Sequence, residues 1–479
     1  LKYKLNLTPD FQFYRYNSYE GLFDFGLAKH DITAVTEQQT RTRNILVENL
    51  LTFDRTFGDH KVSALVGYTY QDSRYRYMQG SGQGMPTGIT EIDAASQGLA
   101  VSGNSSRSVL TSILGRAFYS YKNRYLLTAT IRRDGSSKFG SNYRYGNFPS
   151  VSVGWNIAEE DFVKNSVSWL DQLKLRGGYG VLGNQEIDNY QYVSVVTTGI
   201  NYPDGKSGLI QGAFPKTFAN PDIKWAETAM TNVGIDFMAL RNRLTLTADW
   251  YVKNTKDILL NVPIPISTGG ANDPIRNAGK IRNQGFEFNL GWNESLNKDL
   301  SYGVSFLGTY NKNEVVEMGA ESQVITGGTI HGGTYTSRTL AGYPIGGFWL
   351  IPTDGYFNST EEVQAHQKDG VLIQPSAEPG DIRFKDTNND GTINDEDRVY
   401  CGSPFPKFTY SINGNITYKN VDFSIGFQGV TGNKIYNATK LELTDVTRGT
   451  NYLASTLDYW TPENQNASSP RLIWTDPNR

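Results

Sequence analysis

The feature that most constrains the fold of this chain is a two-residue alternation of apolar and polar side chains across residues 406–430. Such a period fits an extended strand, because successive side chains of a strand point to opposite faces of a sheet. A two-residue turn at Lys419 and Asn420 puts Tyr418 and Val421 on one face, which predicts a hairpin with both strands in register. Each strand exceeds the five or six residues typical of globular proteins and reaches the roughly 9–11 residues needed to cross a bilayer.

The same alternation recurs along the chain, and the segments that carry it are joined by short and long connections in turn. Short turns at one end and long loops at the other are typical of outer-membrane β-barrels. We therefore predict an all-β fold, an antiparallel transmembrane barrel, in which the insert at residues 314–405 is the largest extracellular loop. A short helix is expected at residues 158–172. The roughly thirteen predicted strands are residues 1–16, 40–57, 61–77, 106–121, 125–133, 148–157, 173–179, 228–239, 244–253, 285–292, 301–311 and the two halves of 406–430.

Composition favours a membrane crossing by strands. The chain has 29 Tyr, 23 Phe and 49 Gly, a mean hydropathy of -0.46, and no uncharged apolar run long enough for a membrane helix. An up-and-down barrel in water would share the alternation, but a β-propeller would show blades at a fixed period, which the sequence lacks. Aromatic residues recur near the predicted strand ends, as interfacial girdles do: Tyr70, Tyr77, Tyr125, Trp155, Trp250, Trp292 and Tyr418.

Charge and cysteine content exclude some classes of protein. The net charge of -3 and the lack of a basic cluster in the sequence argue against a nucleic-acid partner. Cys401 is the single cysteine, so no intrachain disulfide is possible.

An odd number of strands with ends on opposite sides of the membrane cannot close a barrel. We therefore expect residues 1–479 to be part of a barrel whose remaining strands lie outside this sequence.

Several long blocks, in order, resemble the SusC/RagA class of TonB-dependent outer-membrane transporters. They are residues 132–162, 169–185, 220–237, 243–265, 277–290, 342–349, 380–398 and 459–466, and they include NPDIKWAETAMTNVGIDF, GYPIGGFW and GDIRFKDTNNDGTINDEDR. The resemblance implies a barrel of about 22 strands with a plugged lumen. It also implies a SusD-like surface lipoprotein that acts as a lid, and energy supplied through TonB. No plug, no TonB-binding segment and no final strands are recognisable in this sequence.

The resemblance implies import of nutrient oligomers, either oligosaccharides or peptides, across the bacterial outer membrane. A surface adhesin or structural barrel and a passive porin are the alternatives. In the predicted barrel, the polar positions of the strands would line the lumen or contact the plug: Thr245, Thr247, Asp249, Asn413, Asn415 and Asp422. The loop aromatics Tyr335, Phe348, Trp349 and Tyr356 fit sugar binding, but they fit loop packing or lid contact equally well. We assign no substrate site.

The sharpest local motif is the loop DTNNDGTINDED at residues 386–397. Asp386, Asn388 and Asp390 occupy positions 1, 3 and 5 of an EF-hand-like loop, the Thr392 carbonyl occupies position 7, and Asp397 stands at position 12 where Glu is usual. These oxygen ligands suit Ca²⁺, which would stiffen an extracellular loop. The alternative is an Asx-rich turn without a metal.

No set of residues in the sequence indicates an enzyme. His30, His60, His331 and His366 are scattered, without metal-ligand spacing or a neighbouring nucleophile. The glycines of residues 177–184 suit close strand packing better than phosphate binding. The acidic run at residues 159–161 suits the first turn of the predicted helix better than glycosidase chemistry.

Overall fold

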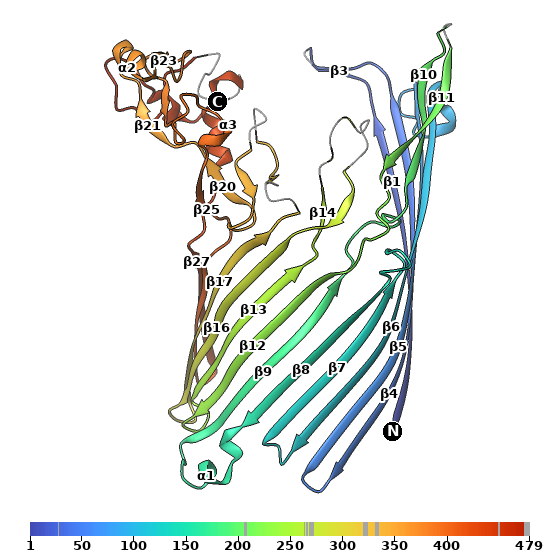
Figure 1. Cartoon of the computed structure of the whole chain (residues 1–479), viewed down its shortest axis with the longest axis vertical. Helices are drawn as coiled ribbons and strands as arrows, with labels where there is room; N and C mark the ends of the chain where they lie inside the picture. Colours follow the sequence, from blue (N-terminus) through green and yellow to red (C-terminus); the bar gives the residue numbers. More distant parts are fainter. Residues whose placement is uncertain are drawn as a thin grey trace. The chain divides into compact units, whose positions relative to one another are not determined.

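A computed structural model describes residues 1–473 apart from 27, 206–207, 263, 265–266, 268–272, 320–323, 331–334 and 449–450. It divides into two compact units, Leu1–Lys280 and Ile281–Arg479, which are described separately (Figure 1). Within the described ranges, no helix has the length and apolar character that a membrane-spanning helix needs.

The first unit contains nine long strands, each antiparallel to its neighbours, in the order in which they follow one another along the chain. They are β1 (Lys2–Glu20), β4 (Ala34–Phe57), β5 (His60–Gln83), β6 (Gln97–Tyr121), β7 (Tyr125–Ser136), β8 (Tyr145–Asn156), β9 (Leu170–Asn184), β12 (Ala226–Ala239) and β13 (Leu244–Lys256). Three small hairpins project from the long connections: β2 (Phe23–Asp24) with β3 (Lys29–His30), β10 (Val195–Pro203) with β11 (Leu209–Thr217), and β14 (Leu259–Asn261) with β15 (Ile275–Asn277). The predicted short helix is present as a 3-10 turn at Ile157–Glu159 followed by α1 (Asp161–Lys164).

The second unit contains four long strands: β16 (Lys280–Ser295), β17 (Leu300–Glu317), β26 (Phe408–Tyr418) and β27 (Val421–Thr431). Between β17 and β26 lies the large insert, which forms short strands and one helix. These are β18 (Ile325–Thr326), β19 (Ser337–Thr339), β20 (Gly347–Leu350), β21 (Thr353–Tyr356), α2 (Thr360–Ala365), β22 (Gln367–Lys368), β23 (Val371–Leu372), β24 (Ile382–Phe384) and β25 (Val399–Gly402). After β27 come α3 (Ala438–Thr444) and short helical turns.

The described residues thus contain the thirteen long strands that the alternation predicts, nine in one unit and four in the other. The predicted hairpin at residues 406–430 is confirmed, with Tyr418 opposite Val421 across a turn in which Lys419 has a φ of 53°. In the three-residue turn between β6 and β7, Lys122 and Asn123 also have positive φ, 52° and 56°, and the Arg124 N–H donates to the Tyr121 carbonyl at 2.9 Å.

The predicted strands are too short at the end of the sheet where the long loops connect them. Residues 79–103 were expected to be a loop, yet β5 continues to Gln83 and β6 begins at Gln97. Residues 34–39, expected in a polar insert, belong to β4. In these extensions polar residues and glycine predominate, apart from a few apolar residues such as Val35, Leu99 and Val101, so the alternation is weak although the backbone ladder continues.

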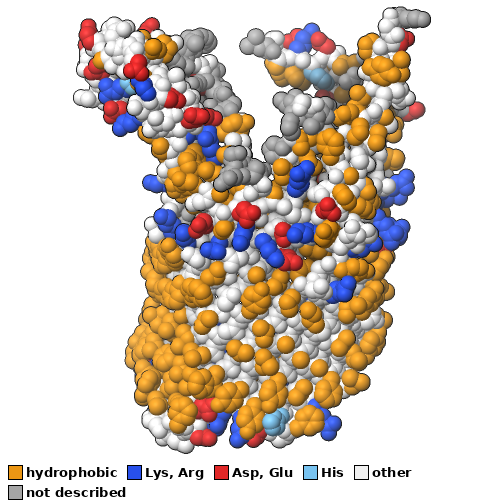
Figure 2. Space-filling view, in the orientation of Figure 1, with side chains coloured by type: hydrophobic (Ala, Val, Ile, Leu, Met, Phe, Trp, Pro, Cys, Tyr) orange, Lys and Arg blue, Asp and Glu red, His pale blue; other side chains and the backbone are white. Residues whose placement is uncertain are grey.

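Each unit exposes an apolar face on its long strands. In the first unit this face includes Val66 and Ile113, which are 60% and 59% exposed, and in the second it includes Phe423 and Phe427, which are 58% and 60% exposed. Figure 2 shows hydrophobic side chains gathered over the lower part of the long strands and a band of charged side chains higher on the same strands. An exposed apolar surface of this extent marks a contact with lipid or with another protein.

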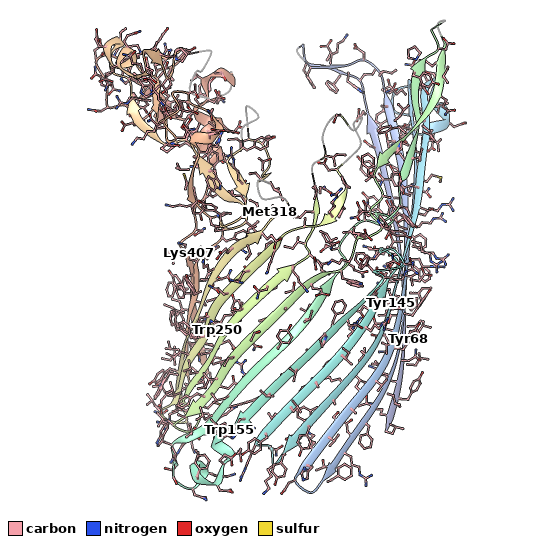
Figure 3. The ribbon with its side chains drawn as sticks, in the orientation of Figure 1. Tyr68, Tyr145, Trp155, Trp250, Met318 and Lys407 are labelled. Atoms are coloured by element: carbon pink, nitrogen blue, oxygen red, sulfur yellow. The ribbon has the colours of Figure 1, made fainter. Side chains whose placement is uncertain are left out.

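A row of aromatic rings marks the end of the apolar face next to the short turns. His60, Tyr121, Tyr125 and Trp155 lie opposite one another on four successive strands. The ring of Tyr125 stacks on those of Tyr121 and Trp155, with centroids 6.4 and 6.5 Å apart. Figure 3 places Trp155 at this end of the strands. The row agrees with the predicted girdle. Tyr77, which was also predicted to belong to the girdle, lies on the other face of β5 from Tyr68 and Tyr70. Side chains alternate between the two faces of a strand, and Tyr77 is separated from Tyr68 and Tyr70 by an odd number of residue positions.

Candidate functional site

Opposite the apolar face of the first unit lies a polar face that carries charged side chains. Three neighbouring strands bring Arg176 of β9, Gly234 of β12 and Asp249 of β13 into one row. Asp236 lies two residues further along β12, and therefore on the same face. The sequence prediction that Asp249 belongs to the polar face is consistent with this register.

Arg176 joins the two carboxylates. Its Nη1 and Nη2 each donate a hydrogen bond of 2.6 Å to Asp249, and its Nε lies 3.1 and 3.2 Å from the two carboxylate oxygens of Asp236. The guanidinium reaches across Gly234, where a Cβ would come within 2.7 Å of the Arg176 Cζ. The three charged side chains are between 22% and 26% exposed. The arrangement cross-links three strands, and it leaves one net negative charge fixed on the polar face.

A second polar group lies on the same face of β6 and β7. Arg132 donates from Nε to Asp134 at 2.7 Å and from Nη2 to the Ser112 hydroxyl at 2.9 Å. Asp134 and Ser112 are buried, at 9% and 1% exposure. The Ser112 hydroxyl and the Asp134 carboxylate both accept hydrogen bonds from Arg132, so this group, like the Arg176 group, stiffens the sheet through charge-assisted hydrogen bonds.

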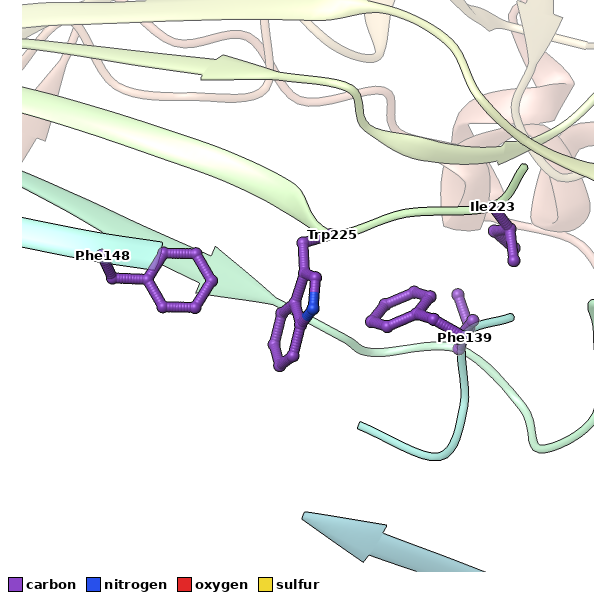
Figure 4. Packing of buried hydrophobic residues seen from close by; sticks show 5 residues of the cluster. Phe139, Phe148, Ile223 and Trp225 are labelled. Carbon is purple, nitrogen blue, oxygen red and sulfur yellow. The ribbon is translucent and has the colours of Figure 1, made fainter. Parts of the chain in front are cut away.

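An apolar cluster fixes the long connections of the first unit at the end away from the short turns (Figure 4). It consists of Phe139, Phe148, Ile187, Ile223 and Trp225, all at most 8% exposed. The Trp225 ring lies 5.1 Å from that of Phe139 and 5.3 Å from that of Phe148, and its Nε1 donates to the Arg144 carbonyl at 3.1 Å. The cluster thereby packs two connections that are far apart in sequence, residues 137–144 and 185–225, against each other and against β8.

The structure places the predicted calcium loop in the large insert of the second unit. Asp386 accepts the backbone N–H groups of Asp390 and Gly391, at 3.1 and 2.8 Å. Asp390 accepts the N–H and the hydroxyl of Thr392, both at 2.8 Å, and the hydrogen bond from that hydroxyl is the main cause that lowers the Asp390 pKa. Asn388 donates from its amide to Asp390 at 3.0 Å.

Asp397 at position 12 is completely buried and binds backbone rather than facing the other acidic residues. Its two oxygens accept the N–H groups of Thr387 and Asn394 at 2.7 and 2.8 Å. Among the described residues, no three His, Cys, Asp or Glu side chains gather as metal ligands. The Asp386 and Asp390 oxygens, the Asn388 amide oxygen and the Thr392 carbonyl have the chemistry that Ca²⁺ prefers, so the calcium assignment stays a prediction.

The remaining candidate residues have structural partners. His60 binds the Tyr119 hydroxyl at 2.8 Å, His30 the Gly21 carbonyl at 2.9 Å, and His366 packs edge-on against Phe357. His331 lies outside the described residues.

The acidic run and the glycine stretch also have structural roles. Arg124 donates to Glu160 at 3.2 Å and to Asp161 at 2.5 Å, which ties the connector before β9 to the turn before β7. A hydrogen bond from Tyr125 is the main cause that lowers the Glu160 pKa, and one from Arg124 that lowers the Asp161 pKa. Close packing explains Gly183, where a Cβ would overlap the Phe148 ring, and Gly178, where a Cβ would come within 2.8 Å of the Asn232 Oδ1, but it does not explain Gly177.

The loop aromatics of the insert are engaged in packing. The Trp349 ring contacts those of Tyr343 and Tyr400, with centroids 4.7 and 5.8 Å away. Phe348 and Tyr356 are half-buried, and Tyr335 is 39% exposed. The packing alternative therefore accounts for Trp349, and nothing in these contacts singles out a sugar site.

Long antiparallel strands with one apolar face, one polar face and short turns at one end define the class of outer-membrane β-barrel proteins. The family model for the β-barrel of TonB-dependent receptor-like proteins matches residues 1–468. The chain belongs to this family, whose members are outer-membrane transporters rather than enzymes.

Two curated relatives illustrate the match. TonB-dependent receptor P3 of Formosa agariphila is 30% identical over 91% of this chain and 43% of its own length. TonB-dependent receptor SusC of Bacteroides thetaiotaomicron is 33% identical over 69% of this chain and 32% of its own length. The chain thus spans less than half the length of these relatives.

Among solved structures, the RagAB peptide transporter has the same fold. It superposes with a TM-score of 0.80 at 21% identity, over 98% of this chain and 50% of the RagAB chain. The RagAB peptide importer in its "open-open" state gives a TM-score of 0.81 at 22% identity over 49% of that chain. The predicted barrel fold and the SusC/RagA resemblance are confirmed.

Proposed function

We propose that this chain forms part of the wall of a TonB-dependent importer that takes up nutrient oligomers, oligosaccharides or peptides, across the outer membrane. In this proposal the polar face lines or contacts a filled passage. The observation that supports it best is the Arg176 group, because a cross-strand network of charges suits a wet or plugged interior and would be costly against lipid.

The proposal includes two partners. A SusD-like surface lipoprotein would act as a lid over the long connections, and TonB would supply energy through a plug. Support for the lid comes from relatives named SusC and RagAB. Each unit by itself would offer ordered contacts to such a lid, the first through the connections packed on the apolar cluster around Trp225, and the second through the short strands and helix in the described part of the large insert.

An uptake experiment with the full-length gene product tests the proposal. Cells that carry or lack the gene are given fluorescent oligosaccharides and peptides, with and without a protonophore. We expect uptake that needs both the gene and the proton-motive force, and co-purification of a surface lipoprotein. Uptake that persists with the protonophore would indicate a passive porin, and surface attachment without uptake would indicate an adhesin.

A further inference from the structure

Five arginines gather on the apolar-face side of β4, β5 and β6, at the end away from the short turns. We call them the arginine patch: Arg41, Arg43, Arg74, Arg76 and Arg107. Strand register puts Phe13, Arg41 and Arg76 in one row, and Phe11, Arg43, Arg74 and Arg107 in the next. Lys and Arg side chains are visible at the right side of Figure 2, where Figure 1 draws β4, β5 and β6.

The patch shares its face with the exposed apolar residues of the same strand. Along β5, Val66, Tyr68, Asp72 and Arg74 differ by even numbers, so their side chains point the same way. Phe11 and Phe13 of β1 border the patch and are 57% and 75% exposed. The surface therefore changes from apolar to strongly basic without changing sides of the sheet.

The patch carries excess positive charge. Asp72 is the carboxylate within it, and it accepts two hydrogen bonds from Arg107, at 3.0 and 3.1 Å, and two longer ones from Arg74. Arg43 lies 3.8 Å from the same carboxylate. Among the described residues, Arg41 and Arg76 have no carboxylate partner. Five guanidinium groups against one carboxylate leave a charge of about +4 on a surface of three strands.

The patch also forms a groove. Its floor and rim enclose a volume of about 520 Å³, bordered by Phe11, Phe13 and Tyr190. The Tyr190 hydroxyl lies 3.1 Å from the backbone nitrogen of Arg107, so the connection after β9 closes one side. The Nε of Arg43 is buried and has no hydrogen-bond partner. Guanidinium groups that are partly free and converge in this way suit the planar, bidentate recognition of phosphate.

The height of the patch matches the headgroup level of the bilayer. Arg74 follows His60, which belongs to the aromatic row, by 14 residues along β5. At about 3.3 Å per residue and a tilt of about 35–45°, this distance is roughly 33–38 Å along the membrane normal. The apolar band of such barrels is about 25 Å tall, so the patch lies about 10 Å beyond it.

We propose that the arginine patch binds the phosphate groups of a phosphorylated glycolipid of the outer leaflet, whose acyl chains lie on the apolar face below. The ligand needs both a phosphate group and acyl chains to contact the whole surface. A soluble anion would contact the arginines alone, and an uncharged lipid would contact the apolar face alone. This inference depends on the outer-membrane location of the chain and not on the proposed transport.

Binding of purified lipopolysaccharide to the full-length protein in detergent tests the inference. Fluorescent lipopolysaccharide is titrated against wild type, Arg41→Gln/Arg76→Gln, and the control Arg15→Gln/Arg55→Gln. The control removes two arginines on the same face, one already paired with Glu37 at 2.9 Å and one beside the turn over the Phe57 ring. We expect at least tenfold weaker binding for the patch variant and less than twofold change for the control. Heat-modifiable migration on a gel verifies that each variant is folded.

Three further binding measurements test whether the phosphate groups of the lipid account for its affinity for the arginine patch. Enzymatically dephosphorylated lipopolysaccharide should bind at least tenfold more weakly to wild type, and 10 mM inorganic phosphate should displace little of the intact lipid. Arg41→Lys/Arg76→Lys should recover part of the affinity, because it restores charge without bidentate geometry. Equal binding of intact and dephosphorylated lipid, equal losses in patch and control variants, or full displacement by inorganic phosphate would each overturn the inference. Capture of an acidic protein by the patch in place of lipid would overturn it as well.

Discussion

Replacing Arg176 by Met tests whether the polar face depends on its cross-strand charges. The substitution removes four short contacts, two to Asp249 and two to Asp236, and leaves the two carboxylates facing each other on adjacent strands. Exposed ion pairs contribute about 0.2–1 kcal/mol, whereas breaking a buried pair costs about 3–5 kcal/mol. Because about a quarter of each side chain is exposed, we expect a loss of about 2–3 kcal/mol in the free energy of unfolding.

The assay is urea unfolding of the full-length protein in liposomes, followed by tryptophan fluorescence. Arg116→Met is the matched control, since this arginine lies on the same face of β6, is exposed, and has no carboxylate partner within the described part of the chain. We expect it to change the free energy of unfolding by less than about 0.5 kcal/mol. A double-mutant cycle of Arg176→Met with Asp249→Asn should give a coupling of about 1–2 kcal/mol. A coupling near zero, or equal losses for Arg176→Met and Arg116→Met, would refute the reasoning.

Three further substitutions follow from the same contacts. Gly234→Ala should cost about 1–2 kcal/mol in urea unfolding because a Cβ displaces the guanidinium above it, whereas Gly177→Ala, whose Cβ would meet its nearest neighbours at an ordinary contact distance of 3.9 Å, should be near neutral. Trp225→Ala should cost about 3–5 kcal/mol locally, and trypsin should then cleave residues 137–144 faster than in wild type, while unchanged cleavage would contradict the role of the cluster. Asp386→Asn should abolish Tb³⁺ luminescence if the calcium prediction is right and Asp395→Asn should not; an absence of luminescence in wild type would refute it.

The strands could be predicted from sequence because the two faces of a bilayer-spanning strand meet different solvents. Lipid on one side and polar surroundings on the other impose the alternation seen at Val421–Thr431. Where β5 continues to Gln83 and β6 begins at Gln97, most side chains are polar or absent, with Leu99 and Val101 as exceptions, and the alternation weakens although the ladder continues. The ends of these strands were therefore missed for a physical reason.

The Arg176 group was only partly predictable. Asp249 was assigned to the polar face from alternation alone, but its partner lies 73 residues away, and two strand registers decide that they meet. Gly234 was the available signal, since a glycine inside a strand marks the close approach of a neighbouring group. The arginine patch was missed because its members are spread over three strands and form no cluster in the sequence.

The length of β4, β5 and β6 has a mechanical consequence. These strands have 24, 24 and 25 residues and are paired along almost their whole length. At about 3.3 Å per residue each extends roughly 80 Å, more than twice what a tilted crossing of the bilayer uses. A load applied at the far tip is therefore carried down a continuous hydrogen-bonded ribbon to the aromatic row at its base, with no hinge between them to absorb it.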